Sequence, residues 1–379
     1  MEFEYSDEQM ALKTEARRFL SEQAPLSDVR RILDGDRRHA EALWSQIGQL
    51  GWCGAVIPEA HGGLGLGYVE LCALAEELGR ALAPTPFSTT IYQFAEAVLA
   101  AGSEAQKSAL LPQVAQGRLI GAMALSEGPG PLSPGRTQTV CRGGLITGRK
   151  APVVDGDAAD FAIVLARDAQ GEEGLFLVDL SGAQVKRTPV SSLDPSRGAA
   201  ILDFDDAVAE PLGAPGPAWP ILEAVLDRAA VLVAFEQLGG ADRCLEMARD
   251  YALQRYTFGR PIGSYQAIKH KLADVYVKNE VARVHCYYAA WALASDAAEL
   301  PVAAAGARIA ASAAYWFASK ENIQVHGGIG FTWEADCHLF FRRARHTSLM
   351  LGAPAEWKRR LIRQLEIAES AKIDAGDRA

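Results

Sequence analysis

A long apolar stretch that begins near Trp219 constrains the fold more than any other part of the sequence. Its pattern predicts one long helix, in which the only charged residues between Glu223 and Glu236 are Asp227 and Arg228. Apolar residues surround this pair, which is typical of a helix buried on all its faces. An ionised pair in such a helix costs free energy unless each charge has a partner or a function. Position alone favours side chains that reach a wet crevice over a catalytic role.

The periodicity of apolar residues divides the 379-residue chain into three segments. Residues 1–120 have helical periodicity, residues 121–215 contain short β-rich runs between turns, and residues 216–379 are again helical. We therefore predict an α+β multidomain protein with an N-terminal helical domain, a central small β-barrel or sandwich and a C-terminal four-helix bundle. The four helices of the bundle are expected at residues 219–256, 265–296, 301–325 and 334–371.

Composition and charge argue against several classes of protein. The net charge is −9 and basic residues form only short pairs, which argues against nucleic acid as a partner. We find neither an uncharged apolar run of about 18 residues that could span a membrane nor the apolar region of a signal peptide. The six cysteines lack the spacing of a metal site, so reduced thiols are expected. The sequence predicts a cytoplasmic protein without metal.

A glycine-rich loop at residues 58–67 has the composition of a phosphate-binding loop. It does not follow a predicted strand, as a dinucleotide-binding fingerprint must. We therefore interpret it as a tight connection between helices.

Four motifs, in the expected order and spacing, resemble those of the flavin-dependent acyl-CoA dehydrogenases. They are the loop and helix at 58–82, Ala122-Met-Ala-Leu-Ser-Glu127, the segment Arg255-Tyr-Thr-Phe-Gly that continues to Gln266, and Gln324-Val-His-Gly-Gly-Ile-Gly-Phe-Thr332. The resemblance covers nearly the whole chain, and four separate motifs are far more specific than a single glycine loop.

The resemblance implies a reaction, a cofactor and partners. A carboxylate removes the α-proton of an acyl-CoA thioester, the β-carbon passes a hydride to N5 of FAD, and fixed donors stabilise the developing enolate oxygen. Electrons leave through an electron-transferring flavoprotein, and the family forms homo-oligomers, usually tetramers. The segment at 331–344 also resembles bacterial subfamilies that act on ring-bearing or branched acyl-CoAs. Some of these are heterotetramers with a related subunit, in which one subunit can lack the base.

The resemblance also assigns cofactor contacts. A planar guanidinium suits a diphosphate, and glycine lets the backbone approach phosphate closely. Structural explanations compete with both assignments, because an arginine at a helix end is favoured by the dipole and glycines commonly cap helices. The residues implied to contact FAD are Ser126, Arg255, Phe258 and Gln266, together with Gln324, Gly327 and Gly328 from a neighbouring subunit.

Two loops depart from the family pattern. After Glu127, the usual Pro-Gly-Ala-Gly-Ser-Asp is replaced at residues 128–134 by Gly-Pro-Gly-Pro-Leu-Ser-Pro. At residues 150–155, Pro152 and Val154 replace the tryptophan and threonine that commonly contact the flavin. We expect altered flavin binding or redox tuning, or loss of the flavin.

The third departure concerns the catalytic base. Leu351 occupies the position of the usual glutamate, and leucine cannot take a proton. A minority of the family carries its base on the long helix instead, at the position of Asp227, and burial there would raise the pKa of a carboxylate. We predict Asp227 as the base and Arg228 as a substrate-binding residue, and interpret Glu356 as a helix-start residue. The alternatives are a partner subunit without a base, a flavin oxidase or oxygenase, and a flavin-free acyl-binding protein.

Overall fold

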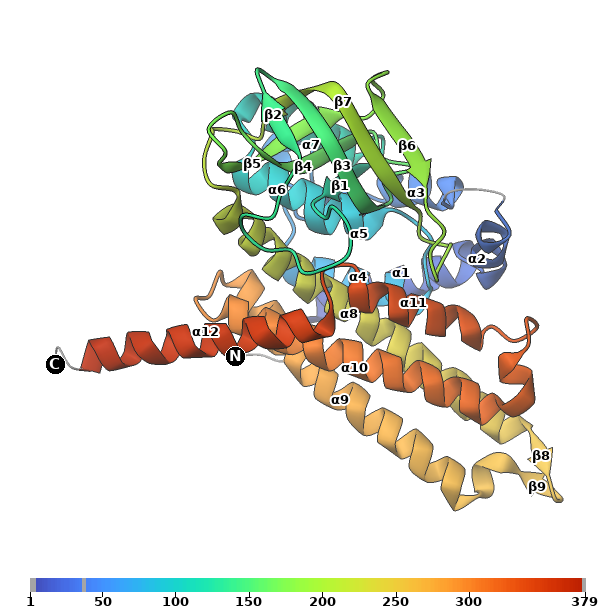
Figure 1. Ribbon diagram of the computed structural model, residues 1–379. Helices are drawn as coiled ribbons and strands as arrows, with labels where there is room; N and C mark the ends of the chain where they lie inside the picture. The colour runs from blue at the N-terminus through green and yellow to red at the C-terminus, as the bar shows by residue number, and fades with distance from the viewer. Residues whose placement is uncertain (1–4, 36–38, 377–379) are drawn as a thin grey trace. The chain divides into compact units, whose positions relative to one another are not determined.

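The computed structural model describes residues 5–35 and 39–376, and the chain forms two compact units (Figure 1). Of the described residues, unit 1 comprises 5–18, 72–82 and 230–376, and unit 2 comprises 19–35, 39–71 and 83–229. Both units are therefore assembled from segments that are distant in the sequence. The helices that contribute residues to both units are α1 (Asp7–Gln23), α4 (Tyr68–Arg80) and α8 (Ala218–Gln254).

Unit 2 contains the short helices that precede the strands. The N-terminus of α7 carries a capping box, in which the Ser103 side chain accepts from the Gln106 backbone N–H and the Gln106 side chain accepts from the Ser103 backbone N–H. A π-helical segment, η3, leads directly into α6. These elements are α2 (Leu26–Leu33), α3 (Glu41–Gln49), η1 (Trp52–Gly54), η2 (Glu59–His61), α5 (Phe87–Thr89), η3 (Thr90–Ala95), α6 (Glu96–Ala101) and α7 (Glu104–Ala115).

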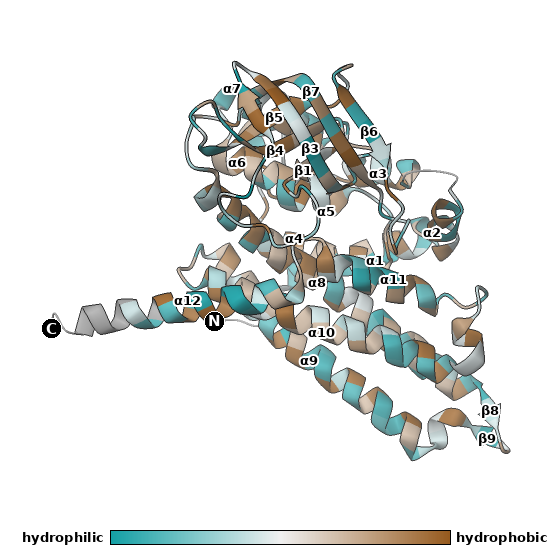
Figure 2. Cartoon of the chain, viewed as in Figure 1, coloured by the Kyte–Doolittle hydropathy of each residue, from teal (hydrophilic) through white to brown (hydrophobic). Residues whose placement is uncertain are grey.

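The seven strands of unit 2 form a barrel. The pairings β4–β2, β2–β3, β3–β7, β7–β5 and β5–β4 close into a ring, while β1 pairs with β4 and β6 with β7. Figure 2 shows hydrophobic residues along β5 and β7, and all five inner residues of β4 are buried. The expectation of a small barrel or sandwich is thus confirmed as a barrel. The strands are β1 (Gly121–Ala124), β2 (Val140–Arg142), β3 (Leu145–Val154), β4 (Phe161–Arg167), β5 (Glu173–Asp179), β6 (Val185–Pro189) and β7 (Ala199–Pro211).

Unit 1 contains the long helices that follow the barrel in sequence. α10 packs against α9, α11 and α12. The helix expected over 334–371 forms as two helices, because the chain turns at Gly352, whose φ is +96°, and Pro354 starts a new helix. No helix among the described residues is long and apolar enough to cross a membrane. The elements are α9 (Gln266–Ala294), α10 (Leu300–His326), α11 (Cys337–Leu349), α12 (Pro354–Gly376), the hairpin β8 (Tyr256–Thr257) and β9 (Arg260–Pro261), η4 (Ile262–Ser264) and η5 (Gly327–Phe331).

Two glycines allow α4 and α8 to cross closely within unit 1. A Cβ atom on Gly79 would lie 1.8 Å from the backbone oxygen of Glu236, and a Cβ atom on Gly239 would lie 1.8 Å from that of Glu76. Because backbone atoms cannot move aside as a side chain can, neither position has room for a larger residue.

The six cysteines are free and buried, as expected for reduced thiols. Burial raises the pKa of the Cys53, Cys244 and Cys286 thiols, because an apolar environment disfavours the thiolate. The cysteines therefore behave as core residues. Unit 2 contains Cys53 and Cys141, and unit 1 contains Cys72, Cys244, Cys286 and Cys337.

Candidate active site

Asp227 lies in the first third of α8, in the part of the helix that belongs to unit 2. Only 3% of its surface is exposed, and the neighbouring residues Val225 and Ala229 are 1% and 0% exposed. The apolar pattern predicted a buried helix, but the expectation that the charged side chains reach a wet crevice does not hold for Asp227, whose carboxylate is buried. A buried carboxylate has lost most of its hydration, which is the environment in which a carboxylate becomes a stronger base.

Arg228, the next residue, is connected to a half-buried tyrosine and, through it, to a buried glutamate. The Nη1 group of Arg228 donates a hydrogen bond of 3.0 Å to the Tyr68 hydroxyl, and the guanidinium carbon lies 5.4 Å from the centre of the Tyr68 ring. The Tyr68 hydroxyl in turn lies 2.9 and 3.0 Å from the two carboxylate oxygens of Glu96. Three helices of unit 2, α4, α6 and α8, thus each contribute one residue to this cluster.

Glu96 is 2% exposed, and burial raises its pKa to about 7, although the charge of Arg228 and the hydrogen bond from Tyr68 oppose the rise. Burial also raises the pKa of the Tyr68 hydroxyl, so Tyr68 is the donor to Glu96. Neither Tyr68 nor Glu96 was predicted as a site residue from the sequence. A signal was present, because Glu96 is the only charged residue between Ala81 and Ser103.

The two loops that depart from the family pattern lie side by side in unit 2. The backbone N–H of Ala151 donates to the Ser126 carbonyl at 2.8 Å, and the Ser126 hydroxyl donates to the Gly128 carbonyl at 3.0 Å. The predicted flavin contact Ser126 thus lies just after β1, where the segment at 128–134 begins, and the segment at 150–154 beside it is the end of β3.

Glu127 fixes the same region through its carboxylate. Oε1 accepts from Lys150 Nζ at 2.7 Å and from the Thr139 hydroxyl at 2.6 Å, and Oε2 accepts from the Gln138 backbone at 2.7 Å. Burial opposes the charge of Glu127, but these hydrogen bonds outweigh it and lower the pKa to about 2. Glu127 is therefore an ionised structural anchor with no proton to exchange near neutral pH.

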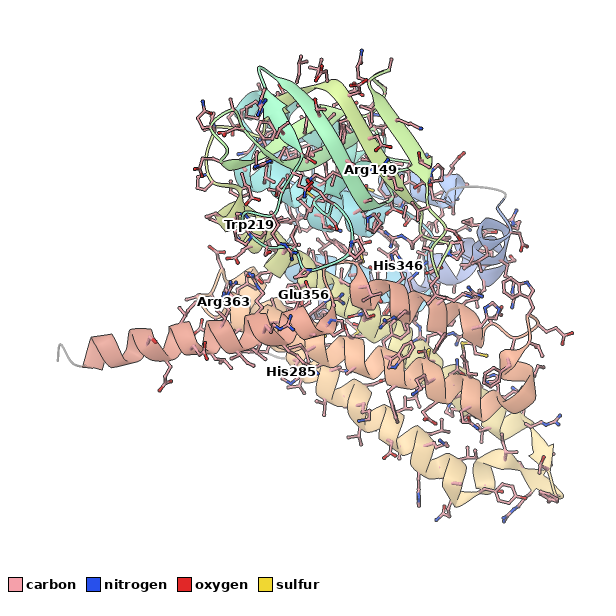
Figure 3. The ribbon with its side chains drawn as sticks, viewed as in Figure 1. Arg149, Trp219, His285, His346, Glu356 and Arg363 are labelled. Carbon is pink, nitrogen blue, oxygen red and sulfur yellow. The ribbon has the colours of Figure 1, made fainter. Side chains whose placement is uncertain are left out.

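A second carboxylate holds the far end of the irregular loop at 128–136. Glu173 accepts from the backbone N–H groups of Gly135 at 3.0 Å and Thr137 at 3.2 Å, and from the indole of Trp219 at 2.5 Å. Trp219 is labelled in Figure 3 and stands at the start of α8. The loop is thus attached at both ends, by Glu127 and by Glu173, despite its unusual sequence.

The remaining predicted cofactor residues lie in unit 1, around the C-terminal ends of α8 and α10 and the start of α9. A small core of Ala248, Ala252 and Val325 joins these helix ends, and the rings of Tyr251 and His326 stack beside it at 4.2 Å. The structure therefore brings the motif that begins at Arg255 and the motif that begins at Gln324 together. The motif residues at this end are Arg255, Phe258, Gln266, Gln324, Gly327 and Gly328.

Leu351 lies in the turn between α11 and α12 and is 8% exposed. Its carbonyl accepts from the indole of Trp357 at 2.9 Å. Glu356, labelled in Figure 3, lies in the first turn of α12, where a carboxylate is favoured by the helix dipole. Its Oε2 atom lies 3.0 Å from the position that a Cβ atom on Gly352 would take. Glu356 is thus a helix-start residue whose carboxylate folds back over the turn that contains Leu351.

Comparison with known proteins decides the family. Residues 6–118 match the acyl-CoA dehydrogenase N-terminal domain and residues 219–365 match the C-terminal domain. The chain belongs to the acyl-CoA dehydrogenase family. It is 37% identical over 367 residues to acyl-CoA dehydrogenase IpdE2 of Mycobacterium tuberculosis, covering 96% of this chain and 98% of that protein.

Solved structures of the family have the same fold as this chain. The Tcur3481–Tcur3483 steroid ACAD is 32% identical with a TM-score of 0.86, covering 97% of this chain and 99% of that one. The ChsE4–ChsE5 complex from Mycobacterium tuberculosis is 26% identical with a TM-score of 0.87, covering 97% and 99%. The dehydrogenase is thus an FAD-dependent oxidoreductase of acyl-CoA thioesters, as the four motifs predicted.

The residues at the end of unit 1 fit the anionic part of FAD. The Arg255 side chain is exposed and, within the described residues, makes no hydrogen bond or ion pair. A Cβ atom on Gly327 or Gly328 would meet nothing within 4 Å, so space is open beside the backbone of both glycines. Phe258 is 93% exposed, although aromatic side chains usually bury most of their surface. An unpaired cation, an exposed ring and an open glycine turn form a surface that a diphosphate and an adenine can cover.

Proposed function

We propose that this dehydrogenase oxidises its acyl-CoA substrate with Asp227 as the base that removes the α-proton. When bound, FAD supplies the hydride acceptor for the β-carbon. The protein contributes a buried carboxylate, a fixed surrounding structure and the exclusion of water. Ser126 is proposed to hydrogen-bond the flavin, and Arg255, Phe258 and Gln266 to bind the adenosine diphosphate side together with Gln324, Gly327 and Gly328 of a neighbouring subunit.

The observation that carries the proposal is that the chain has a buried carboxylate at position 227 and an apolar residue at position 351. Asp227 places a carboxylate on α8 with 3% of its surface exposed, whereas Leu351 places an apolar side chain where the family commonly has its glutamate. A base must lose hydration and still ionise. Burial of Asp227 meets the first requirement, and the neighbouring positive charge of Arg228 favours the second. Arg228 is proposed to bind substrate, with part of its hydrogen-bonding capacity used by Tyr68.

The names of similar proteins support a substrate class. One solved neighbour is described as a steroid ACAD, and the motif at 331–344 resembles subfamilies that act on ring-bearing acyl-CoAs. We propose a ring-bearing acyl-CoA as the substrate, an electron-transferring flavoprotein as the electron acceptor, and an oligomer that completes the FAD site.

A second candidate function is that of a subunit without a base in a heteromeric dehydrogenase. Three observations favour it: Leu351, the altered loops after Glu127 and Lys150, and two solved neighbours that are described as two-component assemblies. In that case a related chain provides the base, and Arg255 and the glycine turn of this chain serve the shared FAD site.

The visible absorption spectrum of the purified protein, followed by anaerobic addition of a ring-bearing acyl-CoA, tests the proposal. We expect bound oxidised flavin with bands near those of free FAD, and bleaching on addition of the thioester by the chain alone. A colourless chain that bleaches flavin only after a second dehydrogenase chain is added would support the heteromer instead. Rapid reoxidation of the bleached flavin by O₂ would indicate an oxidase or oxygenase.

A further inference from the structure

Glu96 is a buried carboxylate to which the proposed reaction assigns no role. It begins α6, is 2% exposed and accepts a hydrogen bond from Tyr68 of α4. An ionisable group in an apolar helix costs free energy, and a buried hydrogen-bonded glutamate is therefore either a structural anchor or a group with a function.

The hydrogen bonds of the cluster run in one direction. Arg228 carries only donors, so its contact with Tyr68 makes the tyrosine oxygen the acceptor. The single hydroxyl hydrogen of Tyr68 then points to Glu96, whose two oxygens lie 2.9 and 3.0 Å away. Tyr68 thus links a guanidinium to a carboxylate, and the charge of Glu96 offsets part of the charge of Arg228.

Asp227 is the chain neighbour of Arg228. Consecutive residues of an α-helix point about 100° apart, so holding Arg228 toward Tyr68 turns Asp227 toward a different side of α8. Their Cα atoms are nevertheless only about 3.8 Å apart, and charges in a buried region are poorly screened by salt. The net charge around Arg228 therefore influences the ionisation of Asp227.

We propose that Glu96 is a positioning residue for the reaction, which acts through Tyr68 and Arg228 by determining how strongly the charge of Arg228 is felt at Asp227. With Glu96 ionised, the positive charge is offset and Asp227 is a stronger base. With Glu96 protonated, less of the positive charge of Arg228 is offset, ionised Asp227 is stabilised more strongly, and proton abstraction slows. This inference rests on the proposal that Asp227 is the base.

The acidity of Glu96 places this change near neutral pH. Burial raises its pKa to about 7, opposed by the charge of Arg228 from α8 and the hydrogen bond of Tyr68 from α4, which are the titratable groups that act on it. The two charge states of the cluster therefore interchange near pH 7.

The pH dependence of flavin reduction by acyl-CoA, measured by stopped flow, tests the inference. In the wild-type protein we expect the rate constant to rise about threefold or more between pH 6 and 8.5, through an ionisation near pH 7. In Glu96→Gln this rise is lost while flavin content stays unchanged. In Glu96→Asp, which keeps an ionisable group, it is retained. A purely structural role would change the maximal rate or the stability without removing the ionisation.

Tyr68→Phe provides a second, directional test. Without the hydroxyl, Glu96 loses a hydrogen bond that favours its charged form, so the ionisation in the rate profile moves to higher pH. An unchanged profile in both Tyr68→Phe and Glu96→Gln would overturn the inference.

The pH dependence of stability separates failure of this inference from failure of the proposed function. A carboxyl whose pKa is raised by folding stabilises the protein below its ordinary pKa of 4.5, and this contribution is lost as pH rises to about 7. We expect Glu96→Gln to flatten this loss in denaturant titrations. If the stability changes as expected but the rate profile does not, Glu96 titrates without acting on the reaction. If Asp227→Asn retains full activity, the base assignment fails and this inference with it.

Discussion

Replacement of Asp227 by asparagine is expected to lower the rate of flavin reduction by acyl-CoA by about 10³-fold, within the range known for general bases. Asparagine has nearly the same shape as aspartate but cannot accept the α-proton. Because Arg255 and the glycine turn at Gly327 are distant in sequence and belong to the other unit, FAD content should be unchanged. Single-turnover stopped-flow reduction at saturating substrate measures the rate, and the flavin absorbance per chain measures the cofactor.

Glu356→Gln is the matched control for this prediction. Glu356 is the carboxylate closest in sequence to the family's usual base position at Leu351, and it lies in the first turn of α12. We expect Glu356→Gln to reduce flavin at the wild-type rate. Loss of reduction in Glu356→Gln with full activity in Asp227→Asn would move the base from α8 to the α11–α12 turn. Full activity in both variants would mean that a different residue or a partner chain removes the proton.

Replacement of Gly239 by alanine is expected to destabilise the protein by about 3 kcal/mol, the upper part of the range for overpacking a well-packed contact. The new Cβ atom would lie 1.8 Å from the Glu76 carbonyl oxygen, so α4 and α8 must move apart where they cross in unit 1. The loss exceeds the gain of about 1 kcal/mol that alanine normally brings to a helix. Denaturant unfolding followed by circular dichroism measures the free energy of unfolding.

Gly306→Ala provides the comparison, because Gly306 also lies within a helix of unit 1 but has space around it. Its Cβ atom would meet only the His285 ring nitrogen, at 3.4 Å. His285, labelled in Figure 3, is on α9. We expect Gly306→Ala to leave the free energy of unfolding unchanged or to raise it by up to about 1 kcal/mol. Equal destabilisation by both substitutions would show that backbone contact at the α4–α8 crossing is not the cause.

Much of the fold followed from local sequence patterns. In the apolar run after Trp219, the only residues that could end the helix before Gln254 are the paired glycines Gly239 and Gly240. The helix α8 is continuous across them. The β-rich segment predicted a barrel or sandwich, but not which strands pair. The bulges in β3, between Ile146 and Gly148 and between Lys150 and Val153, shift its register against β7 and depend on the partner strand.

The fourth bundle helix shows where periodicity misleads. Apolar spacing continues from Cys337 into the last helix, and this continuity predicted a single element over 334–371. The chain instead turns at Gly352 and begins α12 at Pro354. The Gly-Ala-Pro sequence was a local stop signal that the periodic pattern outweighed in the prediction.

Only the part of the site that lies on one helix could be predicted from the sequence. Asp227 and Arg228 were noticeable because two charges interrupt an apolar helix, although position alone did not predict that the Asp227 carboxylate is buried. Tyr68 and Glu96 could not be joined to them, since Tyr68 is 160 residues from Arg228 and 28 from Glu96 in sequence. Contacts between distant segments arise from packing of helices, which a single sequence does not encode in any local pattern. The roles assigned to Arg255 and Gln324 came from family resemblance.

The distribution of the buried cysteines gives each half of the molecule its own internal reporter. Alkylating reagents reach a buried thiol only after the surrounding structure opens, so the rate of modification measures local opening. Cys53 and Cys141 report on unit 2, whereas Cys72, Cys244, Cys286 and Cys337 report on unit 1. Mass spectrometry of alkylated peptides therefore distinguishes independent opening of the two units from a single cooperative event, without the introduction of any label.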